Sequence, residues 1–188
     1  MTTERKTRKW SELRKTLAKW EPPELIDLVK ELYDASSANR DFLHARLVTN
    51  ADDDSVLKPY RERITSQFYP KRGYGKLHLA EARKAIRDYH KATGNVAGTI
   101  ELMLTFVEDG TAFTREFGDI NSAFYESLES VLCEMVTLLC QEGAELYPRF
   151  RERIQQLATH ANHIGWGFGD CLRDQAGYLE AELECEGR

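Results

Sequence analysis

The sequence predicts an all-α protein of eight or nine antiparallel helices, arranged as an irregular bundle or an α-solenoid-like stack of helical hairpins. Three observations support this fold class. Apolar residues recur at steps of three and four along most segments. No segment shows the period-two alternation of a half-buried strand. Only five prolines interrupt the 188 residues, so long stretches contain no helix breaker.

Residues 1–54 are expected to form an N-terminal helical hairpin unit. Its first helix, from about Lys9 to Trp20, has a stripe of Trp and Leu at helical spacing. A second helix should begin near Pro23, because proline suits a first helical turn, and run to about Ser36. A short third helix ends at Leu47. The polar, acidic run 49–54 reads as a linker, which leaves 55–188 as the main helical domain.

The main domain is expected to hold six further helices, each bounded by a proline, a glycine or a capping residue. Gly94-Asn95 ends one helix, Asn121 caps another and Gly143 ends that one. The expected helices span 55–68, 79–93, 96–117, 121–142, 148–160 and 171–183.

Three short stretches, here called the aromatic–glycine corners, join aromatic residues to glycines between these helices. They are Gly73-Tyr74-Gly75, Phe117-Gly118-Asp119 and the run 165–170. Glycine permits close approach of other chain segments, and large aromatic side chains are usually buried. We therefore expect packed helix junctions in which Trp166 and Phe168 fill the core. The alternative is that the corners converge as the walls of a site, where these rings stack on a ligand.

Charge is distributed in blocks along a chain whose net charge is −5. The segment Lys58–Lys91 carries ten Lys and Arg against three acids, whereas 92–188 carries six against seventeen. The favoured interpretation is that basic helices lie beside acidic ones. The alternative is a surface on the basic segment for nucleic acid or another anion.

The lack of a recognisable targeting signal and the spacing of the cysteines predict a cytoplasmic protein with no membrane partner. No run approaches the roughly 18 apolar residues of a membrane span, and the basic N-terminus lacks the apolar region of a secretory signal. The four cysteines show no CxxC spacing and are expected to be small core residues in a reducing compartment. They are Cys133, Cys140, Cys171 and Cys185.

The loop at the first corner is the leading candidate for an anion site. Lys71, Arg72 and Lys76 surround Tyr74, and glycine backbone N–H groups before a helix can bind phosphate. No Walker Lys-Ser/Thr follows, however, and no strand precedes the loop. The favoured interpretation is a plain exposed turn with Tyr74 packed inward.

Acidic and histidine residues near the other corners form weaker candidates. Glu116 and Asp119 resemble a carboxylate pair, although Asp119 is more simply a cap of the following helix. His160, His163 and Asp170 have residue types that bind divalent ions, but no Glu completes an HExxH motif. We therefore expect no metal and assign no catalytic residue. His163 is read as a hydrogen-bonding residue at a helix end.

Four segments in order carry a resemblance to a known family: 25–33, 68–77, 116–120 and 164–168. With these, the chain resembles a bacterial family of helical proteins known as domain of unknown function 6155, from about Leu25 to the last helix. The resemblance implies a bacterial, intracellular, all-helical protein. It implies no activity, cofactor or catalytic residue.

The favoured function is a cytoplasmic, non-catalytic protein-interaction or scaffold module without a cofactor, because long helices are present and no strong catalytic motif is. The alternative is a binder of nucleic acid or a phosphorylated ligand through 58–91. An enzyme is the third hypothesis, and it would need the corners to converge on one polar pocket. The apolar helix faces also allow a homodimer.

Overall fold

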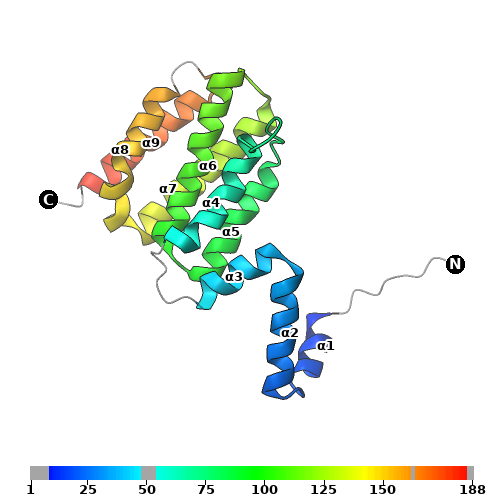
Figure 1. Cartoon of the computed structure of the whole chain (residues 1–188). Coiled ribbons are helices and arrows are strands. Elements are labelled where there is room, and N and C mark those ends of the chain that lie inside the picture. The colour runs from blue at the N-terminus through cyan, green and yellow to red at the C-terminus, as the bar shows by residue number, and fades with distance from the viewer. Residues whose placement is uncertain (1–8, 48–53, 162–163, 186–188) are drawn as a thin grey trace. The chain divides into compact units, whose positions relative to one another are not determined.

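The computed structural model describes residues 9–47, 54–161 and 164–185, and these form nine α-helices, one 3-10 turn and no strand (Figure 1). The predicted all-α class is confirmed. No described helix is both long and apolar enough to cross a membrane. The chain divides into two compact units, unit 1 over 1–43 and unit 2 over 44–188.

Unit 1 contains α1 (Trp10–Leu17), α2 (Pro22–Ala35) and the first residues of α3 (Ser37–Leu47). A capping box starts α2: the Glu21 side chain accepts from the N3 backbone, and the Glu21 backbone N–H donates to Glu24 at 2.8 Å. The Asn39 side-chain amide donates to the carbonyl of Leu32 at 2.7 Å and ties α3 to the end of α2. No residue of α1 or α2 is buried.

The division at residue 43 lies inside α3, ahead of the linker expected from the sequence. Apart from Asp54, which begins α4, that linker lies outside the described residues. The domain boundary at residue 54 stays a prediction.

Unit 2 is built around α6, which packs on α4, α5, α7 and α8. A helix surrounded by neighbours must be apolar on most of its circumference. Accordingly, thirteen of the 22 residues of α6 are buried. The helices of unit 2 after α3 are α4 (Asp54–Phe68), α5 (Leu79–Thr93), α6 (Val96–Phe117), α7 (Ser122–Glu142), α8 (Tyr147–His160) and α9 (Phe168–Cys185).

Close contact between α5 and α6 depends on one glycine. A Cβ atom at Gly98 would collide with the ring and hydroxyl of Tyr89, which is fully buried. Tyr89 in turn packs edge-on against Tyr60 of α4, with ring centroids 5.3 Å apart. The first turn of α6 therefore packs directly on Tyr89, which in turn contacts Tyr60.

An ionic network joins α8 to α6. The Arg153 guanidinium donates to both carboxylate oxygens of Glu108, at 2.7 and 3.0 Å, and to Glu101 at 2.8 Å. The Glu101 side chain is only 14% exposed, and Arg61 of α4 lies 4.0 Å away. These carboxylates, Glu108 first, raise the pKa of Arg153 above its ordinary value. Arg153 thus stays charged and compensates two acids on the central helix.

Candidate functional site

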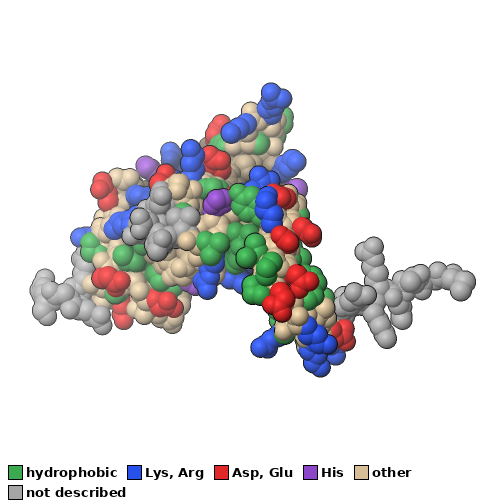
Figure 2. Space-filling view, turned by 60° about the horizontal axis from the view of Figure 1, so that its bottom comes forward, with side chains coloured by type: hydrophobic (Ala, Val, Ile, Leu, Met, Phe, Trp, Pro, Cys, Tyr) green, Lys and Arg blue, Asp and Glu red, His purple; other side chains and the backbone are tan. Residues whose placement is uncertain are grey.

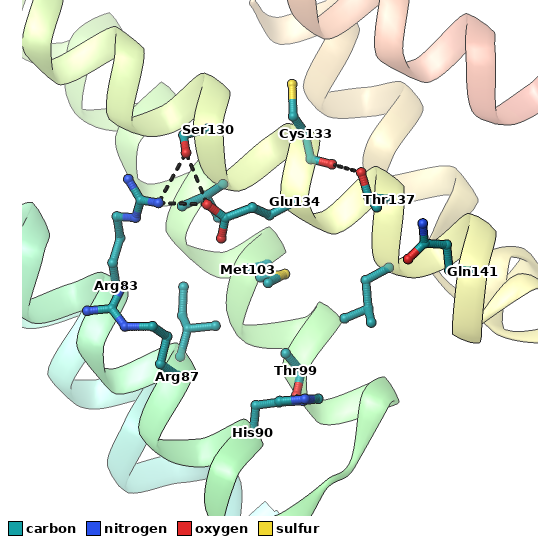
Figure 3. Close-up of a pocket in the computed structure, with 13 residues that line it drawn as sticks. Arg83, Arg87, His90, Thr99, Met103, Ser130, Cys133, Glu134, Thr137 and Gln141 are labelled. Carbon is teal, nitrogen blue, oxygen red and sulfur yellow. Dashed lines mark hydrogen bonds and ion pairs between the residues drawn. The ribbon is translucent and has the colours of Figure 1, made fainter.

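A groove lies between α5 and α7, which both pack on α6 but touch each other little. Its first hollow has a volume of about 570 Å³ (Figure 3). Ile86 and Met103 contribute to an apolar floor, and Leu138 lies on the α7 side. Polar groups on the walls come from α5 (Arg83, Arg87 and His90), α6 (Thr99) and α7 (Ser130, Cys133, Glu134, Thr137 and Gln141).

A second hollow of about 530 Å³ continues the groove toward the start of α7. Arg83 and Arg87 line both hollows, so the two hollows adjoin at these arginines. Since α7 has 21 residues, a groove that follows it is about 30 Å long. The second hollow is also largely apolar, with Leu77, Leu79, Ala80, Ile120, Ala123 and Phe124 in its lining.

Leu77, which lines the second hollow, has a left-handed backbone conformation with φ of 52°. Its backbone N–H donates to the Gln67 carbonyl at 3.0 Å, which holds it in that conformation. Such a conformation is rare and costly for a branched side chain. The loop before α5 is therefore fixed so that Leu77 reaches the groove.

Arg83 bridges the groove at the point where the hollows join. Its guanidinium donates from α5 to Glu134 at 2.7 Å and to Ser130 at 3.1 Å on α7, as Figure 3 shows. The Glu134 side chain is 49% exposed, so this pair adds little to stability. A ligand carboxylate can therefore replace Glu134 as the partner of Arg83 at small cost.

The side chain of His90 has a defined orientation at the far end of the groove. The Thr99 hydroxyl donates its one proton to the Asn95 carbonyl at 2.7 Å. Its oxygen can then only accept from Nδ1 of His90, which is 3.1 Å away. This arrangement puts a hydrogen on Nδ1 and leaves Nε2 for a ligand.

The predicted basic segment is partly neutralised within unit 2. Three of its arginines form ion pairs: Arg61 with Asp54, Arg63 with Asp88 and Arg83 with Glu134. Arg83–Glu134 and the 4.0 Å pair of Arg61 with Glu101 join this segment to the acidic part of the chain, as expected for basic helices beside acidic ones, whereas the pairs with Asp54 and Asp88 do not. Arg87 makes no such pair among the described residues, and it is exposed on the groove wall.

The first corner is an exposed turn, but the expected inward packing of Tyr74 is wrong. Tyr74 is 90% exposed, and Lys71, Arg72 and Lys76 beside it are exposed as well. The backbone of this turn packs directly against the end of α4, because a Cβ atom at Gly75 would collide with the carbonyl of Phe68. With the backbone so close to α4, there is no room for Tyr74 under the loop.

The second and third corners meet at Tyr125 of α7. Its hydroxyl donates to Asp119 Oδ1 at 2.8 Å and lies 2.5 Å from the Thr114 hydroxyl. Its ring lies nearly parallel to that of Trp166, with centroids 6.4 Å apart. A Cβ atom at Gly165 would lie 3.1 Å from Asp119 Oδ2, so the two corners are in tight contact. This junction is packed, as expected from the sequence.

Two details at this junction correct the sequence interpretation. Phe168 is fully buried as expected, but Trp166 is 61% exposed and does not fill the core. Asp119 does not cap α7, because Asn121 accepts from the Phe124 backbone N–H at 2.9 Å. Trp166 has φ of 61°, and that backbone conformation directs its indole over the face of Tyr125 at the surface.

The remaining candidates lie apart from the groove. Glu116 is exposed, and its charge adds to burial, the main cause, in raising the pKa of the nearby Tyr69. Asp170 is exposed and pairs with Arg173, and His160 is exposed at the end of α8. The prediction for His163 falls outside the described residues. Within the described parts of the chain, no three His, Cys, Asp or Glu residues are grouped as metal ligands.

The cysteines differ from the expected core positions. Cys133 is exposed, and Cys140 and Cys171 are half-buried. Burial, with a smaller effect of the neighbouring Cys133, raises the pKa of the Cys171 thiol to about 11. The side chain of Cys185 lies outside the described residues.

Asp109 of α6 is a half-buried carboxyl that the sequence did not reveal. Burial raises its pKa from 3.8 to about 6, although a 2.7 Å hydrogen bond from Thr65 opposes the rise. It lies on the α4 side of α6 and does not line either hollow of the groove. Asp109 is therefore expected to affect the stability of unit 2 rather than binding in the groove.

No protein-family model, curated protein or solved structure matches the chain. The resemblance to domain of unknown function 6155 stays a prediction.

Proposed function

We propose that unit 2 is a protein-interaction module that receives an amphipathic helical segment of a partner in the α5–α7 groove. The alignment of the two adjoining hollows carries this proposal, because their linings together follow most of the 21 residues of α7. A small ligand needs one enclosed pocket, whereas a helix needs a long apolar channel.

The groove walls define the chemistry of the partner. Apolar residues at helical spacing would contact Met103 and Leu138, and the Leu77 end would take a further apolar side chain. Carboxylates on the edge of the partner helix would pair with Arg87 and compete with Glu134 for Arg83. A hydrogen-bond donor would meet Nε2 of His90. The module is proposed to act in the cytoplasm without catalysis.

A selection from a displayed library of random helical peptides tests this proposal. The full chain serves as bait, and Leu138→Glu, which puts a charge on the apolar wall, serves for counter-selection. We expect enriched sequences with apolar residues at steps of three and four and with flanking acids. No enrichment, or peptides that bind Leu138→Glu equally well, would contradict the proposal.

A second candidate function rests on the exposed loop of the first corner. The Tyr74 side chain is 90% exposed, and its neighbours Arg72 and Lys76 are exposed as well. A base-stacking residue beside phosphate-binding cations has this arrangement. Binding of a fluorescent single-stranded RNA should then weaken steeply with salt and be lost in Lys71→Glu/Arg72→Glu. RNA binding that is unchanged in this variant would exclude the loop.

A further inference from the structure

Two cysteines that are far apart in the sequence lie side by side where α9 packs on α7. The side chains of Cys133 on α7 and Cys171 on α9 are within hydrogen-bonding distance of each other. Seven residues further along each helix, Cys140 lies close to Tyr178, and both line a hollow of about 610 Å³ with Cys133. A step of seven residues is about two helical turns, so it returns to the same face of a helix. The two contacts therefore place Cys133 and Cys171 on facing sides of helices that run in the same direction.

Cys133 is the member of this pair that an oxidant in solution reaches. It is exposed, whereas Cys171 is half-buried. Although Cys133 also belongs to the lining of the first hollow of the groove, Figure 3 shows its sulfur directed away from Arg83 and Glu134. The chemistry of the thiol pair therefore does not depend on what the groove binds.

An exposed thiol beside a sheltered one is the arrangement of an oxidant-sensing pair, in which the second thiol resolves the oxidised form of the first. Burial raises the pKa of Cys171 to about 11, and Cys133, Glu129 and Asp174 add to the rise. Cys171 therefore does not compete with Cys133 for the oxidant, because the thiolate is the reactive form. In a reducing compartment such a disulfide forms only transiently.

We propose that Cys133 and Cys171 are a redox-active pair, which a hydroperoxide oxidises to a disulfide between α7 and α9. In the first step the Cys133 sulfur attacks the hydroperoxide, whose O–O bond breaks to give a sulfenic acid and an alcohol, or water from hydrogen peroxide. In the second step the Cys171 sulfur attacks the Cys133 sulfur, and the hydroxyl group leaves as water with the Cys171 proton. The two thiols lose two protons and two electrons, which reduce the hydroperoxide. The second step is intramolecular, and this offsets the small thiolate fraction of Cys171.

Mapping of the disulfides in the full chain after treatment with hydrogen peroxide tests the proposal. Free thiols are blocked with N-ethylmaleimide, and tryptic digestion then separates Cys171, in peptide 154–173, from Cys133 and Cys140, in peptide 116–149. We expect these peptides to be linked in the wild type and in the matched control Cys140→Ser, but not in Cys133→Ser. The link constrains the unfolded chain, so it should raise the thermal midpoint by about 5–10 °C, and dithiothreitol should reverse the rise.

Cross-links between chains are the main alternative product, because unit 1 exposes large apolar side chains that favour association. Trp10 and Ile26 are each 67% exposed, and Figure 2 shows apolar side chains at the surface of the molecule. The oxidation is therefore carried out on dilute protein and checked by electrophoresis without reductant. A wild type that lacks the link after peroxide, a link that survives in Cys133→Ser, or linkage only between chains would overturn the proposal.

Discussion

The hydroxyl of Tyr125 on α7 donates to Asp119 Oδ1 at 2.8 Å and thereby fixes the turn between α6 and α7 to the helix that follows it. Burial is the main reason that the pKa of Tyr125 lies above its ordinary value, so the hydroxyl stays protonated as the donor. The same ring supports Trp166 and Phe168 from the junction of α8 and α9. One side chain thus joins two of the three aromatic–glycine corners.

Tyr125→Phe should lower the free energy of unfolding by about 1–2 kcal/mol, because Asp119 loses a donor and the buried Thr114 loses a partner. Urea unfolding followed by circular dichroism measures this. Tyr178→Phe, which removes the hydroxyl of an exposed tyrosine, is the control and should have little effect. Equal effects of the two changes would show that the junction is not held by this bond.

Arg153→Met should destabilise unit 2 by about 2 kcal/mol, because Glu101 is only 14% exposed and would lose its shortest ion pair. Methionine retains most of the apolar part of the arginine side chain, so the loss of stability measures the contribution of the charge. Arg173→Met removes an arginine from an exposed pair with Asp170 and should cost well under 1 kcal/mol. Thermal unfolding at low and high salt would measure both, and similar losses would refute the account.

Asp109 should make stability fall as pH rises from about 4 to about 6. Its pKa is 3.8 when unfolded and about 6 when folded, so in this window the native state holds the extra proton. Ionisation therefore disfavours the native state above the window. Asp109→Asn keeps an acceptor for Thr65 and should raise stability at pH 7 by about 2 kcal/mol. Urea unfolding at pH 4 and at pH 7 measures both effects, and a wild-type stability that does not fall over this window would contradict the prediction.

Two glycine-to-alanine changes should have opposite signs. Gly98→Ala forces a methyl group into Tyr89 and should destabilise by about 1–3 kcal/mol. Gly177→Ala in α9 meets no atom within 4 Å and should stabilise by about 0.5–1 kcal/mol, through helix propensity. Urea midpoints report both, and a neutral Gly98→Ala would mean that α5 and α6 can move apart.

Helix positions were predictable because they follow local rules. As expected, Asn121 caps α7 and Gly94 ends α5 in a left-handed conformation, whereas Asn95, expected with Gly94 at the end of α5, caps α6. The apolar residues that recur at helical spacing are buried along the helices of unit 2, Ile64 and Phe124 among them. These signals lie within a few residues of the feature that they predict.

The groove was not predictable, because it depends on how far apart α5 and α7 lie. Arg83 and Arg87 fell within the predicted basic segment, but nothing local distinguishes a bridging arginine from an exposed one. The left-handed conformation of Leu77 gives no composition signal either. The exposure of Tyr74 and Trp166 was not predicted for a related reason. An aromatic residue beside a glycine indicates close packing of the backbone, but it does not indicate whether the aromatic ring itself is buried.

The central claim is that the α5–α7 groove binds a helical segment, and the most direct measurement is the affinity of the best selected peptide for three proteins. Calorimetric titration should give similar dissociation constants for the wild type and Leu47→Glu. For Leu138→Glu, where a charge enters the apolar wall, the constant should be at least about tenfold weaker. Equal affinity for all three proteins would contradict the claim.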